Sequence, residues 1–213
     1  MGTESDARFW DRNARKYARE PIADPAGYEH SLQRTLEVLN REDRVLELGC
    51  GTGSTALRLA THVQSYLGTD VSTAMIRIAD EKRAAANIPA LAFEVATAEA
   101  PTLEAGAFDV VLGFNYLHLV RDIPDTLRRI HRLVKPGGMF VSKTPCLGDM
   151  NPLIGGILLP VMHALGRAPH VNVLREVELD AQIRSAGFEV LAIEDHSTRG
   201  KVRRPFMVAR RHP

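Results

Sequence analysis

The stretch VLELGCGTGSTALRLA, residues 45–60, constrains the fold of this chain more than any other feature. Val45, Leu46 and Leu48 form a short apolar run that is typical of a buried strand, and helical spacing follows the glycines. Glycines at every second position predict a tight turn whose backbone approaches a ligand at the start of a helix. An ordinary turn between a strand and a helix fits the same glycines, so the loop alone identifies no ligand.

The rest of the chain alternates short apolar runs with segments of helical periodicity, which indicates βαβ units. Strands are expected at residues 44–48, 65–70, 90–96, 108–114, 139–144, 188–195 and 203–210. Helices are expected at residues 5–19, 25–39, 55–63, 73–86 and 123–134. Residues 196–202 are too few for a parallel crossover, so the last two strands should be antiparallel. The predicted fold class is α/β, a doubly wound, seven-stranded, mostly parallel sheet with a C-terminal antiparallel hairpin.

Length and composition favour one domain spanning residues 1–213, with residues 1–40 as an N-terminal helical cover. The net charge of +1 gives no global attraction to nucleic acid or to an anionic membrane. Only two cysteines occur, Cys50 and Cys146, which favours a reducing cytoplasm and no metal site. No apolar run reaches the roughly 18 residues of a membrane-spanning helix.

Two acidic residues flank the glycine loop. Asp70 ends the second predicted strand, where its carboxylate can accept both hydroxyls of a ribose or cap the next helix, a role that Ser72 can take instead. Glu47 interrupts an apolar strand, and a cationic ligand group would offset the cost of burying it. Ser54 replaces the third glycine of the dinucleotide fingerprint, which disfavours a nicotinamide oxidoreductase, as does the final hairpin.

Four segments in order resemble the motifs of class I S-adenosylmethionine-dependent methyltransferases: ELGCGTG, LGTDVSTAMI, FDVVLGFNYLHLV and LVKPGGMFV. The resemblance covers most of the chain and is greatest to small bacterial enzymes, of the small-molecule type, in which a segment like FWDRNARKYA forms a helix over the cofactor. It implies S-adenosylmethionine as cofactor, S-adenosylhomocysteine as product, and methyl transfer to a small apolar or aromatic metabolite. A catalytically silent subunit that binds S-adenosylmethionine, as a regulator or partner, is the alternative.

The resemblance also assigns roles at the methionine end of the cofactor. Glu47 would hold the methionine amine, directly or through water. Gly49, Cys50 and Gly51 would line the methionine part, and Tyr17 would close over its carboxylate.

At the nucleoside end the resemblance assigns the ribose to Asp70 and the adenine face to Val71, with Met75 nearby. Thr97 stands where the family usually has aspartate, so adenine binding would rest on its weaker hydroxyl contact or on the Ala98 backbone.

In the family, the residue at Asn115 faces the methyl group. Methyl transfer is an in-line displacement that needs a base only if the acceptor loses a proton. His118 is the candidate base and Tyr17 a polar positioner, while His163 and His170 are further candidates. The alternative for His118 is a packed or capping imidazole.

Residues 145–178 are expected to form a lid-like insertion over the acceptor, by analogy with insertions at this place in the family. Its apolar part, residues 152–166, also fits a dimer contact or a membrane-surface patch. The basic C-terminal run STRGKVRRPFMVARRHP is typical of a solvated sheet edge. After the fourth strand the chain has FNYLHL, whereas methyltransferases of this fold that act on amino groups of nucleic acids carry NPPY or DPPY there. These features predict a small-molecule acceptor, no nucleic acid, no stable membrane insertion, and a monomer or homodimer.

Overall fold

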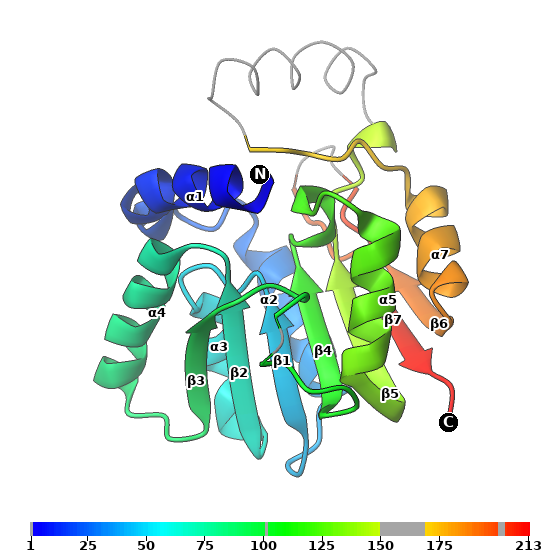
Figure 1. Cartoon of the computed structure of the whole chain (residues 1–213), viewed down its shortest axis with the longest axis horizontal. Helices are drawn as coiled ribbons and strands as arrows, with labels where there is room; N and C mark the ends of the chain where they lie inside the picture. The colour runs from blue at the N-terminus through cyan, green and yellow to red at the C-terminus, as the bar shows by residue number, and fades with distance from the viewer. Residues whose placement is uncertain (1, 101, 150–168, 200–202) are drawn as a thin grey trace.

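The computed structural model describes residues 2–100, 102–149, 169–199 and 203–213. One seven-stranded sheet carries helices on both faces (Figure 1). The strands are β1 (Arg44–Leu48), β2 (Ser65–Asp70), β3 (Leu91–Val95), β4 (Phe108–Phe114), β5 (Val134–Lys143), β6 (Phe188–Glu194) and β7 (Phe206–Arg211). The α-helices are α1 (Gly2–Arg19), α2 (Pro25–Leu36), α3 (Ser54–Leu59), α4 (Thr73–Ala86), α5 (Ile123–Leu133) and α7 (Glu176–Ser185). Three short 3₁₀ turns are η1 (Ala60–His62), η2 (Leu117–Leu119) and η3 (Leu147–Asp149).

The strand order confirms the predicted fold class. The sheet runs β3-β2-β1-β4-β5-β7-β6, and β7 is antiparallel to both β5 and β6 whereas the other pairs are parallel. The chain winds outward in one direction through β1, β2 and β3 and in the other through β4 and β5. Ligands of open α/β sheets bind at the carboxyl ends of the strands where this direction reverses, between β1 and β4.

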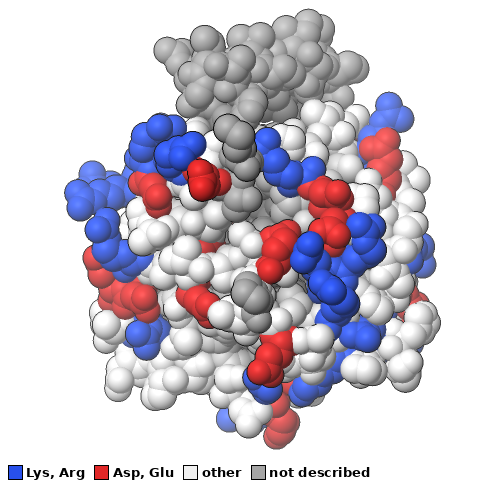
Figure 2. Space-filling model, viewed as in Figure 1, with Lys and Arg blue, Asp and Glu red and all other residues white. Residues whose placement is uncertain are grey.

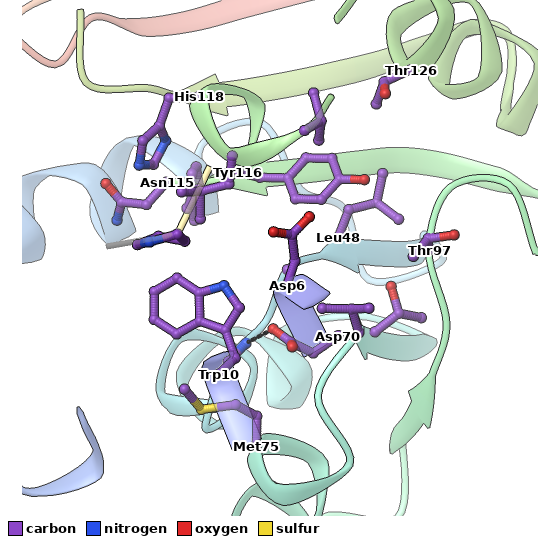
Figure 3. A pocket seen from close by; sticks show the side chains of 18 of the residues that line it. Asp6, Trp10, Leu48, Asp70, Met75, Thr97, Asn115, Tyr116, His118 and Thr126 are labelled. Atoms are coloured by element: carbon purple, nitrogen blue, oxygen red, sulfur yellow. Dashed lines mark hydrogen bonds between the residues drawn. The ribbon is translucent and has the colours of Figure 1, made fainter. Parts of the chain in front are cut away.

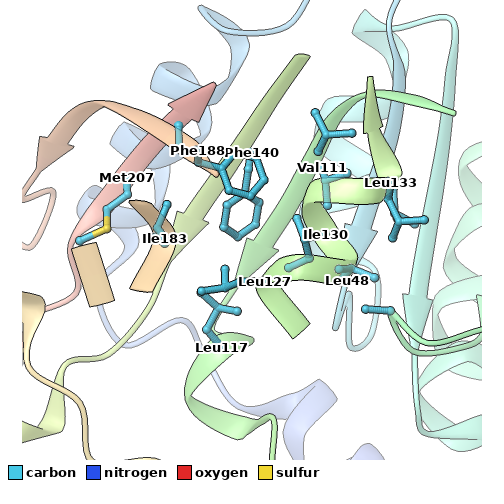
Figure 4. Packing of buried hydrophobic residues seen from close by; sticks show 14 of the residues in the cluster. Leu48, Val111, Leu117, Leu127, Ile130, Leu133, Phe140, Ile183, Phe188 and Met207 are labelled. Carbon is cyan, nitrogen blue, oxygen red and sulfur yellow. The ribbon is translucent and has the colours of Figure 1, made fainter. Parts of the chain in front are cut away.

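Two apolar clusters hold the layers together. Helices α5 and α7 bury Leu127, Ile130 and Ile183 against one face of the sheet, where they surround Phe140 and Phe188 (Figure 4). On the other face, α2 and α3 contribute the second cluster, which includes Leu32, Ala56, Leu59, Tyr66 and Phe206. Each fully buried leucine contributes about 1.5–3 kcal/mol to the stability of the fold, so the clusters on both faces of the sheet stabilise it.

The boundaries of several elements differ from the sequence-based prediction. Helix α2 ends at Leu36 and not at residue 39, and α3 gives way to a 3₁₀ turn at Ala60. Strand β5 begins at Val134, five residues early, because pairing with β4 continues across an irregularity next to Gly137 and Gly138. Strand β7 begins at Phe206, after Pro205, which has no N–H to donate to a neighbouring strand.

Helix α7 is absent from the sequence-based prediction. Only two of its residues, Leu179 and Ile183, are buried, one turn apart, while Val177 is exposed. This pattern is too sparse to stand out as helical periodicity. The helix therefore depends on its packing against α5 and β6.

Helix α1 lies across the edge of the sheet where β1, β2 and β4 end (Figure 1).

Basic and acidic side chains are mixed over the face of the molecule seen in Figure 2, in keeping with the net charge of +1. Within the described residues, no helix is long and apolar enough to cross a membrane. The apolar segment 152–166 and His163 lie outside the described residues.

Candidate active site

A cavity of about 540 Å³ opens at the carboxyl ends of β1, β2 and β4, beneath α1. It is lined by nine of the residues to which sequence analysis assigns a role: Tyr17, Gly49, Gly51, Asp70, Val71, Met75, Thr97, Asn115 and His118. In Figure 3, Asn115 and His118 stand at one side of this cavity, whereas Asp70, Met75 and Thr97 stand at the other. We call this space the main cavity.

The glycine loop forms the floor of the main cavity. Gly49, Gly51 and Gly53 all have positive φ, at 70°, 54° and 73°, a conformation that glycine adopts without steric cost. A Cβ on Gly49 would lie 2.7 Å from the Tyr116 ring, whereas a Cβ on Gly51 would meet only the Tyr17 Cε1, at 3.8 Å. The loop therefore leaves space for a close ligand above Gly51.

Asp70 projects from the tip of β2 toward this loop. Its Oδ2 accepts a hydrogen bond from the Gly51 N–H and its Oδ1 accepts one from the Ser72 N–H, both at 2.9 Å. Ser72 caps α4 by accepting from the Met75 N–H. Capping therefore falls to Ser72, and both Asp70 oxygens keep a lone pair for a ligand. Burial raises the pKa of Asp70, and the two backbone N–H groups oppose this shift.

Helix α1 is fastened over the cavity at two points. Asp11 Oδ1 accepts hydrogen bonds from the Ser72 hydroxyl (2.7 Å) and the Ala74 N–H (3.0 Å) at the start of α4. Asp6 forms an ion pair with Arg121, which follows β4. These contacts place Trp10 and Tyr17, whose rings meet edge to face with centroids 6.0 Å apart, in the cavity wall.

Three of the predicted cofactor-binding residues do not line the main cavity. Glu47 is 3% exposed and lies beneath the glycine loop, where its Oε2 accepts a 2.8 Å hydrogen bond from the Tyr66 hydroxyl. Cys50 is buried, and its backbone N–H donates to Thr69 O. Ala98 is buried in the apolar core, so its side chain packs away from the cavity.

Burial raises the pKa of the Glu47 carboxyl group. The pKa of Glu47 rises from 4.5 to about 7, chiefly through desolvation, although the Tyr66 hydrogen bond opposes the shift. The folded protein then binds this proton more tightly than the unfolded chain, so stability falls as the pH rises through this interval. We expect the ligand-free protein to lose up to about 3 kcal/mol of stability from this group between pH 4.5 and 7.

Glu47→Gln, which keeps an acceptor for Tyr66 but cannot ionise, should therefore lose less stability than the wild type between about pH 5 and pH 8. Thermal unfolding of both proteins across this range is the measurement. Parallel curves would contradict the assignment of a raised pKa to Glu47.

His118 and Asn115 follow β4. Asn115 has a φ of 51°, and its N–H donates to Lys143 O at 2.7 Å. The pKa of His118 falls to about 4, first because the ring is desolvated and second because of the positive charge of Arg204. The imidazole is thus neutral at neutral pH, and its buried Nδ1 makes no hydrogen bond to any described residue.

Sequence analysis missed several residues of the site. Asp6, Arg121 and Arg204 line the main cavity, as does Trp10, which lies in the segment FWDRNARKYA predicted to cover the cofactor but was not itself named. For the basic run that contains Arg204, the sequence predicts only a solvated sheet edge. The places of Asp6 and Arg204 depend on how α1 and the final hairpin pack, which no local pattern reveals. His170 also stands outside the lining of this cavity.

Lys82 was missed as well. Its Nζ donates to Thr52 O at 2.9 Å and to the Thr52 hydroxyl at 3.0 Å, and so holds the glycine loop from outside the cavity. A lysine one turn before the end of a helix looks like an ordinary surface residue in the sequence. Among the described residues, no group of three or more His, Cys, Asp or Glu side chains is arranged to hold a metal ion.

The sheet and its cavity define an α/β domain with a cavity at its topological switch point. A profile of the methyltransferase domain family matches residues 14–193, so the chain belongs to this family, the S-adenosylmethionine-dependent methyltransferases of the class I fold. The ubiquinone biosynthesis O-methyltransferase of Pseudomonas aeruginosa is 32% identical over 154 residues, 69% of this chain and 65% of that protein. The chain spans from 3% to 65% of the length of the curated relatives first matched.

Solved structures share the fold at low sequence identity. The [4+2]-cyclase SpnF is 19% identical, with a TM-score of 0.78 over 99% of this chain and 95% of that one. The geranyl diphosphate C-methyltransferase of Streptomyces coelicolor, solved with S-adenosyl-L-homocysteine, is 16% identical, with a TM-score of 0.72 over 98% and 97%. The family and this neighbour together identify S-adenosylmethionine as the cofactor. The open space above Gly51 fits the close approach of this cofactor to the loop, and the free lone pairs of Asp70 fit its ribose hydroxyls.

Proposed function

We propose that this protein transfers a methyl group from S-adenosylmethionine to a small-molecule acceptor in the main cavity. The observation that carries the proposal is that Asp70 and the glycine loop share one cavity with Asn115 and His118. A cavity of about 540 Å³ lies within the range typical of small-molecule sites. The side of the cavity near Asn115 and His118 thus has room for an acceptor beside the cofactor.

The proposed cofactor contacts follow the geometry of the lining. Asp70 accepts hydrogen bonds from the ribose, Val71 and Met75 pack against the adenine, and the Thr97 hydroxyl lies at the adenine edge. Gly49 and Gly51 lie against the methionine part, with Tyr17 above it. Glu47 and Cys50 support the loop from below, so any contact of Glu47 with the methionine amine passes through water.

The cofactor supplies a methyl group on a positively charged sulfur. The residues of the chain then have two tasks, to align the acceptor and to exclude water. Trp10 and Tyr17 cover the cavity from α1, and Asn115 faces the reacting centre. His118 is a weak base because its pKa is about 4, so its role is to accept a hydrogen bond that orients the acceptor.

Replacing His118 tests that role. We expect His118→Ala to lower kcat about tenfold, the value of one hydrogen bond, and to change S-adenosylhomocysteine affinity by less than about twofold. His118→Asn, whose side-chain carbonyl can accept a hydrogen bond, should retain more turnover. Steady-state kinetics and calorimetric titration provide the measurements. Equal losses of turnover and of cofactor affinity, or no loss at all, would remove His118 from the acceptor site.

The experiment that tests the function has two stages. Thermal unfolding with S-adenosylmethionine, S-adenosylhomocysteine or NADH first reports cofactor binding, and only the first two should stabilise the protein. A screen of acceptor classes for release of S-adenosylhomocysteine then reports methyl transfer. Stabilisation without turnover on any acceptor class would favour the alternative, a binding subunit that regulates or partners another protein.

A further inference from the structure

A second cavity, of about 320 Å³, lies beside the main cavity. It opens between the start of α2 and the end of β5, and we call it the side cavity. Three residues, Phe114, Asn115 and Arg204, line both cavities. A molecule placed beside Asn115 can therefore extend from one cavity into the other.

The side cavity is positively charged. Lys143, Arg199 and Arg204 line it, against a single described carboxylate, Asp24. Asp24 is already occupied, since its oxygens accept hydrogen bonds from the Gly27 N–H and from the N–H and hydroxyl of Thr198. These hydrogen bonds lower the pKa of Asp24, so its single negative charge offsets only part of the positive charge of the three cations.

Arg204 has no ion pair or hydrogen bond to any described residue, whereas its neighbour Arg203 pairs with Glu176 at 3.0 Å. Burial lowers the pKa of Lys143, and the positive charge of Arg204 lowers it further, while Asp24 and Asp195 oppose the shift. Lys143 and Arg204 thus repel each other, and Asp24 is the one described carboxylate that lines the side cavity with them. An anionic ligand bound to both side chains would relieve this repulsion.

A buried polar network fixes the position of Lys143. Its Nζ donates to the Ser31 hydroxyl at 2.6 Å and to Gly27 O at 3.2 Å. Ser31 is 3% exposed and contacts His196 Nδ1 at 3.1 Å, and His196, 2% exposed, contacts Glu194 through Nε2 at 2.9 Å. Because two of the three ammonium donors are used, one remains for a ligand in the side cavity.

We propose that the acceptor carries an anionic group, a carboxylate or a phosphate ester, which binds in the side cavity between Lys143 and Arg204. The inference rests on the proposed function and names the acceptor class, a small organic acid or phosphate ester whose other end reaches Asn115 and His118. Charge-assisted hydrogen bonds to the two cations fix its orientation. The methyl-accepting atom then lies at the junction of the two cavities.

The test uses matched phenols on the full chain: 4-hydroxybenzoate, 4-hydroxyphenyl phosphate and the neutral 4-hydroxybenzamide. Binding of each is measured by ligand-observed NMR, with and without saturating S-adenosylhomocysteine. We expect at least one anionic probe to bind about tenfold more tightly than the amide, and Arg204→Met to remove that difference. The carboxylate and phosphate arms distinguish the two anions. Arg203→Met, which changes the adjacent exposed arginine, should leave the difference intact.

Arg204 is exposed and unpartnered within the described chain, so Arg204→Met is expected to fold, whereas Lys143→Met also breaks the buried network. Equal binding of all three probes, or anion binding that survives Arg204→Met, would overturn the inference. A loss of S-adenosylhomocysteine affinity equal to the loss of anion affinity would also overturn it, because the cations would then serve the cofactor. Failure of S-adenosylhomocysteine to bind the wild type would instead contradict the proposed function, whatever the probes do.

Discussion

Replacing Asp70 by asparagine is expected to weaken S-adenosylmethionine binding about 100-fold, close to 3 kcal/mol, while the protein stays folded. The carboxylate now accepts the Gly51 and Ser72 N–H groups with one oxygen each. An amide has a single acceptor oxygen, so one of these N–H groups would face an NH₂ group. Two ribose hydroxyls would lose a charged acceptor at the same time. Calorimetric titration of S-adenosylhomocysteine is the measurement.

Asp80→Asn provides the matched control. Asp80 lies on α4, pairs with Arg83 at 3.1 Å and stands outside the main cavity, so its replacement should leave cofactor affinity unchanged. Unfolding curves of both variants report whether the fold is intact. If Asp70→Asn bound the cofactor within about threefold of the wild type, Asp70 would not be the ribose-binding residue.

The sheet could be predicted from sequence because its signals are local. The central parallel strands β1 and β4 are largely buried and therefore appear as apolar runs. The short connection after β6 allows only an antiparallel partner. The glycine loop and Asp70 could be predicted for the same reason, because each directly follows or ends a predicted strand. Helix α7 lacks this signal, because only Leu179 and Ile183 are buried.

The remainder of the site depends on contacts between distant segments. Arg204 reaches the main cavity only because the final hairpin packs beside β5, and Asp6 does so only because α1 crosses the sheet edge. The position of Glu47 beneath the glycine loop, by contrast, could have been predicted from the local sequence. Side chains alternate along β1, so Glu47 faces the same side as Val45 and meets Tyr66 on β2. That alternation alone indicates a residue within the layers of the fold and not in the cavity.

The glycine loop allows binding and folding to be separated by two single substitutions. Gly51→Ala is expected to abolish measurable cofactor binding, a loss greater than about 100-fold, because its methyl group would occupy the space above the loop. The cost to stability should be only about 1–2 kcal/mol, the strain of an alanine at positive φ, since the nearest side-chain atom is 3.8 Å away.

Gly53→Ala should have the opposite effect. Its Cβ would lie 2.6 Å from Phe93 Cζ and 3.0 Å from Ala79 Cβ, inside the layer between β3 and α4 and away from the main cavity. Strain at a φ of 73° and overpacking together should cost about 2–5 kcal/mol of stability. The fraction that remains folded should still bind S-adenosylhomocysteine. Denaturant unfolding and calorimetry on both variants separate the two effects, and normal binding by Gly51→Ala would show that the cofactor does not approach the loop at Gly51.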